Sequence, residues 1–225
     1  KDNLLKEHII KDFQFLLANK YYPSALDKNA RNDKQQVKAI VIACNTATAY
    51  GYEEAAKFVD KTGLNIPIIG VINAAARGTL SFFEKNESGS IGVFATVGTI
   101  SSGGYERTLK EQIKNGNWTG NIQIFNQGGH GLAEAVDEEP DFIQTQASVI
   151  QDNYRGPSLA NTDHQIDKAL LQVYNFNFAD NKMICDSKEV DDCTIMQLND
   201  AENYVRYHSA SLLEKMRKDE DAQPL

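Results

Sequence analysis

The sequence predicts an α/β fold whose sheets are mainly parallel and flanked by helices. Short apolar runs rich in β-branched residues, at 37–43 and 66–72, alternate with longer segments in which apolar residues recur every three or four positions. Strands that are apolar throughout are typical of parallel sheets covered on both faces. Between these two runs, Gly63 ends a helical segment in the manner of a C-terminal glycine. The resulting order of strand, helix and strand is the repeating unit of parallel α/β proteins.

The rest of the chain continues this alternation past its midpoint. Apolar periodicity predicts helices at 4–17, 48–61, 74–84, 99–115, 166–174 and 201–218, and a short helix ending at 136. Short apolar runs predict strands at 37–43, 66–72, 90–94, 122–125, 183–184 and 195–198. The pattern weakens between 137 and 163, where 153–158 has the composition of an irregular loop.

Composition narrows the classes of function. The chain has 225 residues, of which 41% are hydrophobic, enough for one large domain or two small ones. Its formal net charge of -8 comes without a basic stripe, which argues against nucleic-acid binding. The longest apolar runs fall far short of the roughly 20 residues that span a bilayer, so no transmembrane helix is expected.

Cysteine usage gives an expectation for the compartment. Cys44, Cys185 and Cys193 form an odd and sparse set, which predicts free thiols and a reducing cytoplasm. The chain opens on Lys1 with neither a starting Met nor a signal-peptide pattern, and export with a removed N-terminal signal stays open.

Cys44 is the first candidate for chemistry. It follows the apolar run at 37–43, and ligands of open parallel sheets gather outside the carboxyl ends of strands. The next helix begins within a few residues, so its N–H groups and dipole can bind a carboxylate and stabilise a thiolate. Asn45 and Thr46 add short polar donors. The competing interpretation is a small buried structural cysteine, which is the commoner fate of this residue type.

A second polar cluster repeats this layout. Thr96 and Thr99 follow an apolar strand candidate and again open a predicted helix, so they are candidates for an anion site. Threonine is also a usual N-capping residue, and an N-capping loop is the structural alternative.

Three motifs follow one another along the chain: VIACNTA at 41–47, IPIIGVI at 66–72 and IGVFATVGTISSGGY at 91–105. In this order they resemble the glutamate racemases of the aspartate/glutamate racemase superfamily. The resemblance is close over 37–105, loose over the first and last helices, and nearly absent from 138 to 195. Three motifs in one order are far more specific than any single match.

The resemblance implies two pseudo-symmetric α/β domains with the substrate cleft between them. On this basis the first domain comprises 1–84 with 198–225, and the second comprises 85–197. It also implies a cofactor-independent racemase of glutamate or aspartate, with no pyridoxal phosphate and no metal. Two cysteines would face opposite sides of the α-carbon, one removing a proton and the other returning one.

Residue roles follow from the same resemblance. Cys44 would be the first catalytic cysteine, Asn45 and Thr46 would hold the amino and carboxylate groups of the substrate, and the carboxylate would also be bound by Thr96 and Thr99. The acidic amino acid is the partner expected, and the sequence leaves open whether the protein is a homodimer.

Other family motifs are missing from this sequence. An Asp-Ser-Gly and a Pro-Tyr-Gly motif do not occur, and we expect residue 1 to lie just after the second of them. The Gly-Cys-Thr-His motif of the second cysteine is also absent, which leaves three interpretations. Cys185 after a short strand is our first choice and Cys193 the second. In the third, Val173 stands in the place of the cysteine and a single active thiol remains.

A single thiol cannot serve both faces of the α-carbon. The alternatives are therefore a racemase-like protein that binds a carboxylate without turnover, or a lyase of the same superfamily acting on a small dicarboxylate. His130, in a glycine-rich loop, is the best substitute for the second acid or base, although a surface histidine is the commoner explanation.

Overall fold

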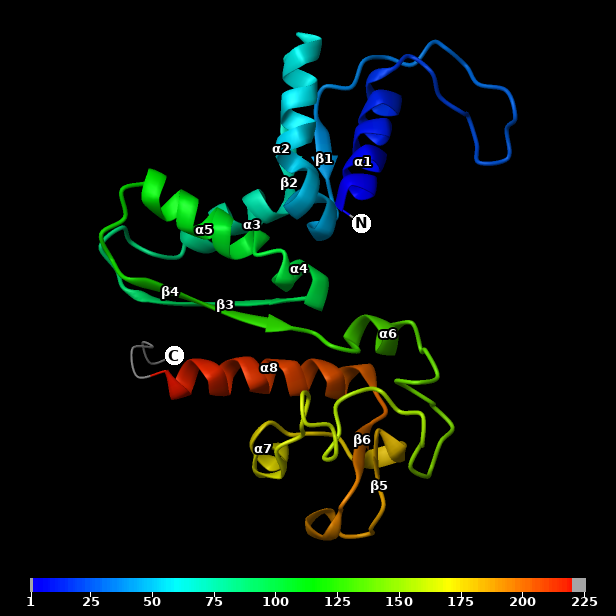
Figure 1. Ribbon diagram of the computed structural model, residues 1–225, viewed down its shortest axis with the longest axis vertical. Helices are drawn as coiled ribbons and strands as arrows, with labels where there is room; N and C mark the ends of the chain where they lie inside the picture. Colours follow the sequence, from blue (N-terminus) through cyan, green and yellow to red (C-terminus); the bar gives the residue numbers. More distant parts are fainter. Residues whose placement is uncertain (1, 220–225) are drawn as a thin grey trace. The chain divides into compact units, whose positions relative to one another are not determined.

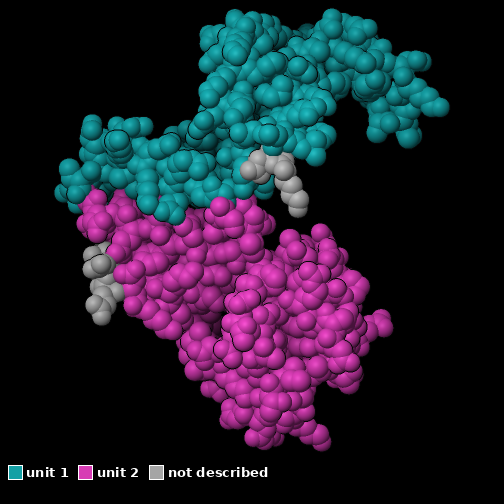
Figure 2. Space-filling view, viewed as in Figure 1, with its two compact units in different colours: residues 1–87, 102–119 teal, residues 88–101, 120–225 magenta. Residues whose placement is uncertain are grey.

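The computed structural model describes residues 2–219 and divides into two compact units (Figures 1 and 2). Unit 1 comprises residues 1–87 and 102–119, and unit 2 comprises residues 88–101 and 120–225. Among residues 2–219, no helix combines the length and the apolar character needed to cross a membrane.

Unit 1 consists of a pair of parallel strands with helices around it. Its elements are α1 (Asp2–Leu17), β1 (Ile40–Ile42), α2 (Asn45–Thr62), β2 (Ile68–Gly70), α3 (Val71–Leu80) and α5 (Gly104–Asn115). β1 pairs with β2 in parallel, with Ile40 opposite Ile68. Parallel strands are joined by a long crossover connection, usually a helix, and α2 forms this connection between β1 and β2.

The core of unit 1 lies between α1, α2 and the strands. Its buried members are Ile9, Phe13, Ile40, Ile42, Ala55, Val59 and Ile66. α1 packs closely on α2 (Figure 1). This close approach depends on Gly51, because a Cβ there would lie 2.4 Å from Ile9 Cδ1.

Unit 2 contains the second parallel pair and an irregular region closed by a hairpin. Its regular elements are β3 (Gly89–Ala95), α4 (Val97–Ser101), β4 (Ile122–Gly128), α6 (Leu132–Val136), α7 (Lys168–Val173), β5 (Met183–Cys185), β6 (Met196–Leu198) and α8 (Ala201–Lys218). Two short 3-10 turns, at 179–181 and 190–192, complete it. β3 and β4 are parallel, and β5 and β6 are antiparallel.

α8 is the central helix of unit 2 and lies along β3 and β4 (Figure 1). Its apolar residues Leu212 and Met216 pack on Phe125, and Gly92 lets the helix approach because a Cβ there would lie 3.0 Å from Leu212 Cδ2. The other side of α8 contributes to a larger core with the segment that precedes it.

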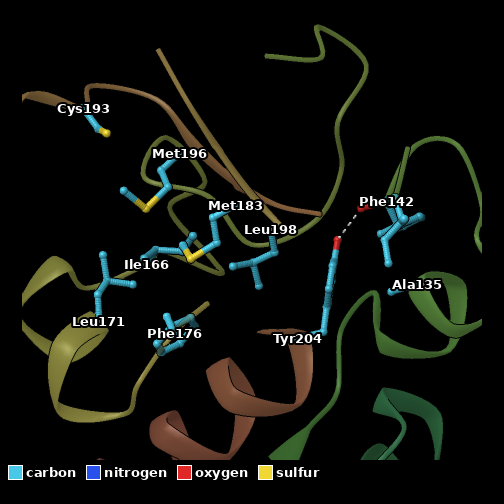
Figure 3. Close-up of a cluster of buried hydrophobic side chains, with 11 residues drawn as sticks. Ala135, Phe142, Ile166, Leu171, Phe176, Met183, Cys193, Met196, Leu198 and Tyr204 are labelled. Atoms are coloured by element: carbon cyan, nitrogen blue, oxygen red, sulfur yellow. Dashed lines mark hydrogen bonds between the residues drawn. The ribbon is translucent and has the colours of Figure 1, made fainter. Parts of the chain in front are cut away.

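This larger core joins α8 to the irregular region (Figure 3). Its buried residues include Phe142, Ile166, Leu171, Met183, Met196, Leu198 and Tyr204. Tyr204 is fully buried, and its hydroxyl donates to the carbonyl oxygen of Phe142 over 3.1 Å. Burial raises the pKa of Tyr204, which therefore stays a neutral donor.

The predicted α/β class is confirmed, with differences at several boundaries. α2 begins three residues earlier than expected, directly after Cys44, and α3 begins at Val71 instead of 74. The predicted helix at 99–115 is two helices, because Gly103 adopts a left-handed conformation with φ 63° between α4 and α5.

The position of the last helix differs from the expected division into domains. We expected residues 198–225 to belong to the first domain together with 1–84, and residues 85–197 to form the second domain. In the structure, α8 lies in unit 2. The physical reason for its position is its apolar face, which packs on β3 and β4. Residues 102–119 likewise group with unit 1 because α5 packs on α3.

Candidate functional site

Cys44 lies between β1 and α2, where the sequence placed it. The side chain is exposed and free, and Cys44 Sγ accepts a hydrogen bond from the Ala47 N–H over 3.5 Å as the N-cap of α2. Buried Thr48 fixes the turn, since its hydroxyl lies 2.9 Å from the carbonyl oxygen of Cys44 and 3.2 Å from that of Ile42. The thiol is therefore held at the start of an 18-residue helix, where the dipole favours an anion.

Asn45 and Thr46 occupy the first turn of α2, beside Cys44. Both are half-buried. The hydroxyl of Tyr105 on α5 donates to Asn45 Oδ1 over 3.0 Å, which orients the side-chain amide. Burial raises the pKa of Tyr105, so the phenol keeps the proton that it donates. The structure thus brings Cys44, Asn45 and Thr46 together and adds Tyr105.

A pocket of about 340 Å³ opens along α2 within unit 1. Its lining includes Thr48, Asn73 and Arg107, while Cys44 is outside it. Arg107 places its guanidinium 3.4 Å from the carbonyl oxygen of Ala49. The pocket is therefore adjacent to the first turns of α2 but separate from the thiol.

Thr96 and Thr99 lie in unit 2, at the carboxyl end of β3. The Thr96 hydroxyl donates to Thr99 Oγ1 over 3.0 Å and accepts the Thr99 N–H over 3.3 Å. This is the hydrogen-bond pattern of an N-cap on α4. Thr99 is buried, whereas Thr96 is exposed and lines an apolar pocket of about 350 Å³ with Phe94 and Leu132. The structure brings the two threonines together, and their substrate role stays a prediction.

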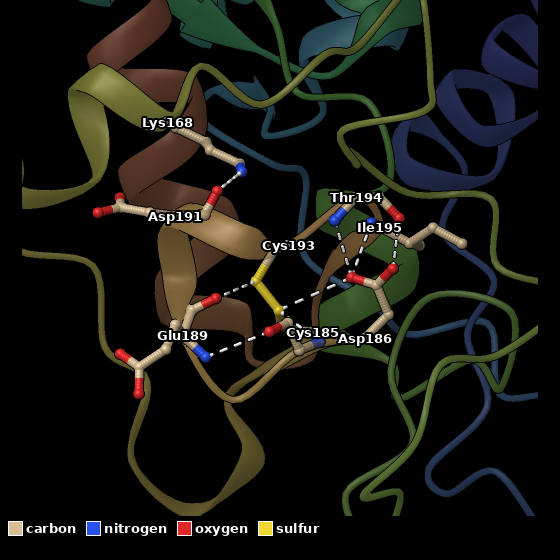
Figure 4. The surroundings of a disulfide bond; sticks show 9 residues. Lys168, Cys185, Asp186, Glu189, Asp191, Cys193, Thr194 and Ile195 are labelled. Atoms are coloured by element: carbon tan, nitrogen blue, oxygen red, sulfur yellow. Dashed lines mark hydrogen bonds between the residues drawn. A yellow bond between two sulfur atoms is a disulfide. The ribbon is translucent and has the colours of Figure 1, made fainter.

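Cys185 and Cys193 are bonded to each other in a disulfide (Figure 4). The expectation of free thiols is therefore wrong for Cys185 and Cys193, and Cys44 is free as expected. Cys185 ends β5 and Cys193 precedes β6, so antiparallel pairing sets their Cα atoms 5.8 Å apart, within the range that a disulfide requires. A bonded sulfur carries no proton, so neither our first nor our second choice for the second catalytic cysteine is a thiol in this form.

Two further residues were considered for the position or the role of the second cysteine, and both are located in unit 2. Val173 is exposed at the end of α7. The His130 ring stacks on that of His164 with centroids 3.9 Å apart, and His130 Nε2 lies 3.0 Å from the carbonyl oxygen of Arg155. Since that carbonyl can only accept, Nε2 of His130 donates to it and Nδ1 is the remaining acceptor.

Sequence reasoning missed two features of these sites. Tyr105 ends the motif at 91–105, but its contact with Asn45 spans 60 positions and depends on the packing of α5 beside α2. The disulfide had a local signal, because Cys185 and Cys193 lie eight positions apart and flank a polar turn between two strand candidates. Asp186 lies in the same turn, and its carboxylate and the two sulfurs lie within 4.8 Å of one another.

Comparison with known proteins gives a family match and several similar proteins. Residues 18–121 match the family described as Asp/Glu/Hydantoin racemase. The glutamate racemase of Enterococcus faecalis is 43% identical over 79 residues, which cover 35% of this chain and 26% of that protein. The glutamate racemase of Streptococcus thermophilus is 45% identical over 76 residues, covering 34% of this chain and 25% of that protein.

Among solved structures, glutamate racemase isoform RacE1 from Bacillus anthracis aligns with a TM-score of 0.43 and 26% identity, covering 63% of this chain and 42% of that one. The segment aligned with the curated relatives spans about a quarter of their length, 26% for the protein of Enterococcus faecalis. Residues 18–121, which match the family model, include β1 and α2, which position Cys44, and the motif that ends at Tyr105. Over residues 18–121, the chain is similar to the family described as Asp/Glu/Hydantoin racemase.

Proposed function

We propose that this protein is a cofactor-independent racemase of an acidic amino acid, glutamate or aspartate, in which Cys44 exchanges the proton at the α-carbon. The observation that carries the proposal is the free, exposed thiol of Cys44 at the N-terminus of α2, within the segment that matches the family. Glutamate racemases are the relatives to which this segment is similar.

The chemistry requires a base and a site for negative charge. An α-proton is weakly acidic, so a carbanion-like transition state must be stabilised by donors at the carboxylate. The first N–H groups of a helix have no partner within the helix, and those of α2 begin at Asn45. The Asn45 amide, oriented by Tyr105, adds a donor at the same end of the helix.

The second face of the α-carbon needs a second proton donor. With Cys185 and Cys193 in a disulfide, Cys44 is the one free cysteine among residues 2–219. This observation favours a second candidate function, in which one thiol serves a binding protein or a lyase of a small dicarboxylate. His130 stays a substitute for the second acid or base, and Nδ1 is the ring nitrogen left for this role because Nε2 donates to the carbonyl oxygen of Arg155.

Solvent isotope exchange separates these functions. The full chain is incubated in D2O with D- or L-glutamate or aspartate, and NMR follows loss of the α-proton while chiral chromatography follows inversion. Two-base racemisation gives deuterium in the opposite enantiomer. A single base gives exchange with retention of configuration. Binding measured by calorimetry without exchange indicates a binding protein, and release of carbon dioxide from a disubstituted malonate indicates a lyase.

Cys44→Ser tests the role of the thiol directly. Serine is a preferred N-cap, so the start of α2 keeps its cap while the thiol is lost. We expect exchange and inversion to fall below detection while the far-UV circular dichroism spectrum stays unchanged. Exchange at the wild-type rate in folded Cys44→Ser would overturn the proposal. Repeating the assay after reduction, with and without Cys185→Ser, tests whether Cys185 is the second base.

The compartment and the partners are also part of the proposal. The acidic amino acid is the small-molecule partner that we propose. The disulfide removes the cysteine-based argument for the cytoplasm, because disulfides persist mainly in oxidising compartments. Fractionation of the source cells, with the redox state of Cys185 read in each fraction, decides between cytoplasm and export.

A further inference from the structure

The turn between β5 and β6 holds two sulfurs and a carboxylate in one place (Figure 4). We propose that Cys185, Cys193 and Asp186 form a Zn²⁺ site when the disulfide between the two cysteines is reduced. The site is separate from Cys44 and does not depend on the racemase proposal.

The hairpin brings the ligand atoms within reach of one ion. The two sulfurs and an Asp186 oxygen all lie within 4.8 Å of one another, on a backbone whose cysteine Cα atoms are 5.8 Å apart. Zinc–sulfur bonds of about 2.3 Å in tetrahedral geometry place two thiolates about 3.8 Å apart. After reduction, rotation of the two cysteine side chains alone can bring the sulfurs to this separation.

Asp186 is already oriented by its neighbours. Its Oδ1 accepts the N–H groups of Thr194 and Ile195 over 2.9 and 3.0 Å, and its Oδ2 accepts the Thr194 hydroxyl. These three bonds hold the Asp186 side chain in one orientation beside the two sulfurs. Asp186 Oδ1 lies 3.9 Å from Cys185 Sγ, so this carboxylate oxygen faces the sulfurs.

The surroundings favour a thiolate and a cation. The Ser187 N–H points at Cys185 Sγ over 3.1 Å, and such a donor stabilises negative charge on sulfur. The turn from 186 to 193 carries four carboxylate residues and one lysine, so its field attracts cations. The nearby ammonium of Lys168 bonds the carbonyl oxygen of Asp191, outside the group of ligand atoms.

Opening the site is a two-electron reduction. A dithiol reductant attacks the Cys185–Cys193 bond and becomes a cyclic disulfide, while its two protons and two electrons leave both cysteines as thiols. Binding of Zn²⁺ then releases these two protons to solvent as the thiolates coordinate.

The donor set selects the metal. Two thiolates with one carboxylate suit Zn²⁺ and do not suit Mg²⁺ or Ca²⁺, which prefer oxygen ligands. Three protein ligands leave a fourth position for water, as in zinc sites that are not closed. Asp186 is exposed, so this fourth position faces solvent.

Cobalt titration tests the proposal on the full chain in a Cys44→Ala background. After reduction with a phosphine, Co²⁺ should give a thiolate charge-transfer band in the near ultraviolet and tetrahedral bands in the visible at one ion per chain. Zn²⁺ should then displace the Co²⁺ and abolish both bands. The same Cys44→Ala protein without reduction is the control and should give no band.

Two carboxylate variants test the third ligand. Asp186→Asn should weaken Co²⁺ binding at least tenfold, whereas Asp192→Asn removes the same charge from the same turn and should bind as before. Cys193→Ser should abolish the charge-transfer band. A reduced, folded protein without this band overturns the site, and equal affinities for the two carboxylate variants overturn the role of Asp186.

Discussion

Tyr105 donates its phenolic proton to Asn45 Oδ1 over 3.0 Å, from a helix that begins more than forty residues after the end of α2. The bond links the motif that ends at Tyr105 to the residue next to Cys44. Because Oδ1 of Asn45 is engaged, its NH2 group is the part of the amide left to act as a donor.

Tyr105→Phe should lower kcat/KM for the proposed exchange reaction about three- to tenfold, since a neutral hydrogen bond contributes roughly 0.5–1.5 kcal/mol. The loss should appear mainly in KM if Asn45 only binds substrate. The measurement is the α-proton exchange rate against substrate concentration.

Tyr52→Phe is the matched control, because its hydroxyl lies 3.5 Å from the carbonyl oxygen of Ile68 on another part of unit 1. Its kinetics should equal those of the wild type. Equal effects of the two substitutions would contradict a specific role for Tyr105.

Stability should fall in mild acid because of His208. This residue is fully buried, its Nε2 donates to the carbonyl oxygen of His130 over 2.9 Å, and its Nδ1 faces the Gln127 amide, which Lys215 holds from the other side. Burial lowers the pKa of His208 from 6.5 to about 4. The unfolded chain therefore binds a proton between these values and the folded chain does not.

His208 thus contributes full stability above pH 6.5, and this contribution is lost as the pH falls from 6.5 towards 4. The slope is at most about 1.4 kcal/mol per pH unit. Urea unfolding of His208→Gln at several pH values should show a smaller slope than the wild type. His8→Gln, on the exposed face of α1, should keep the wild-type slope.

Reduction of the disulfide should destabilise unit 2 by roughly 2–3 kcal/mol, the chain-entropy value for so short a loop. The urea midpoint should fall on adding reductant. The double variant Cys185→Ala/Cys193→Ala should no longer respond to reductant, and Cys44→Ala should respond like the wild type. If reduction left the urea midpoint of the wild-type protein unchanged, this would contradict the presence of the Cys185–Cys193 disulfide.

Two glycines should respond to alanine in opposite directions. Gly103 has φ 63° between α4 and α5, so Gly103→Ala should cost about 1 kcal/mol of the free energy of unfolding. Gly78 lies inside α3 with open space around its Cα, so Gly78→Ala should stabilise by about 0.5–1 kcal/mol. Urea unfolding of both variants gives the two values, and a shared sign would contradict the assigned backbone conformations.

The features predicted correctly from the sequence are those set by local patterns. Apolar runs located the strands β1 to β4, and the change from a strand to a helical pattern located Cys44 at the end of β1. The start of α2 was placed too late because Asn45 and Thr46 are poor helix formers whose position after an N-cap outweighs their propensity.

Features that depend on tertiary contacts were not predictable in the same way. The left-handed conformation of Gly103 divides a segment whose apolar periodicity continues through it. The spacing of Cys185 and Cys193 around a polar turn is a local signal, but their bond also requires β5 and β6 to pair, and two three-residue strands carry too little periodicity to reveal that pairing. The hydrogen bond between Tyr105 and Asn45 likewise follows from helix packing and has no signal in either segment alone.

The exposed thiol of Cys44 also gives the protein a single chemical handle. With the other two cysteines bonded, a maleimide dye or spin label added without reductant attaches at this one position. Such a label reports directly on the end of β1, and an acidic amino acid bound there would slow its attachment. Labelling rates measured with and without ligand therefore provide a binding assay that needs no turnover.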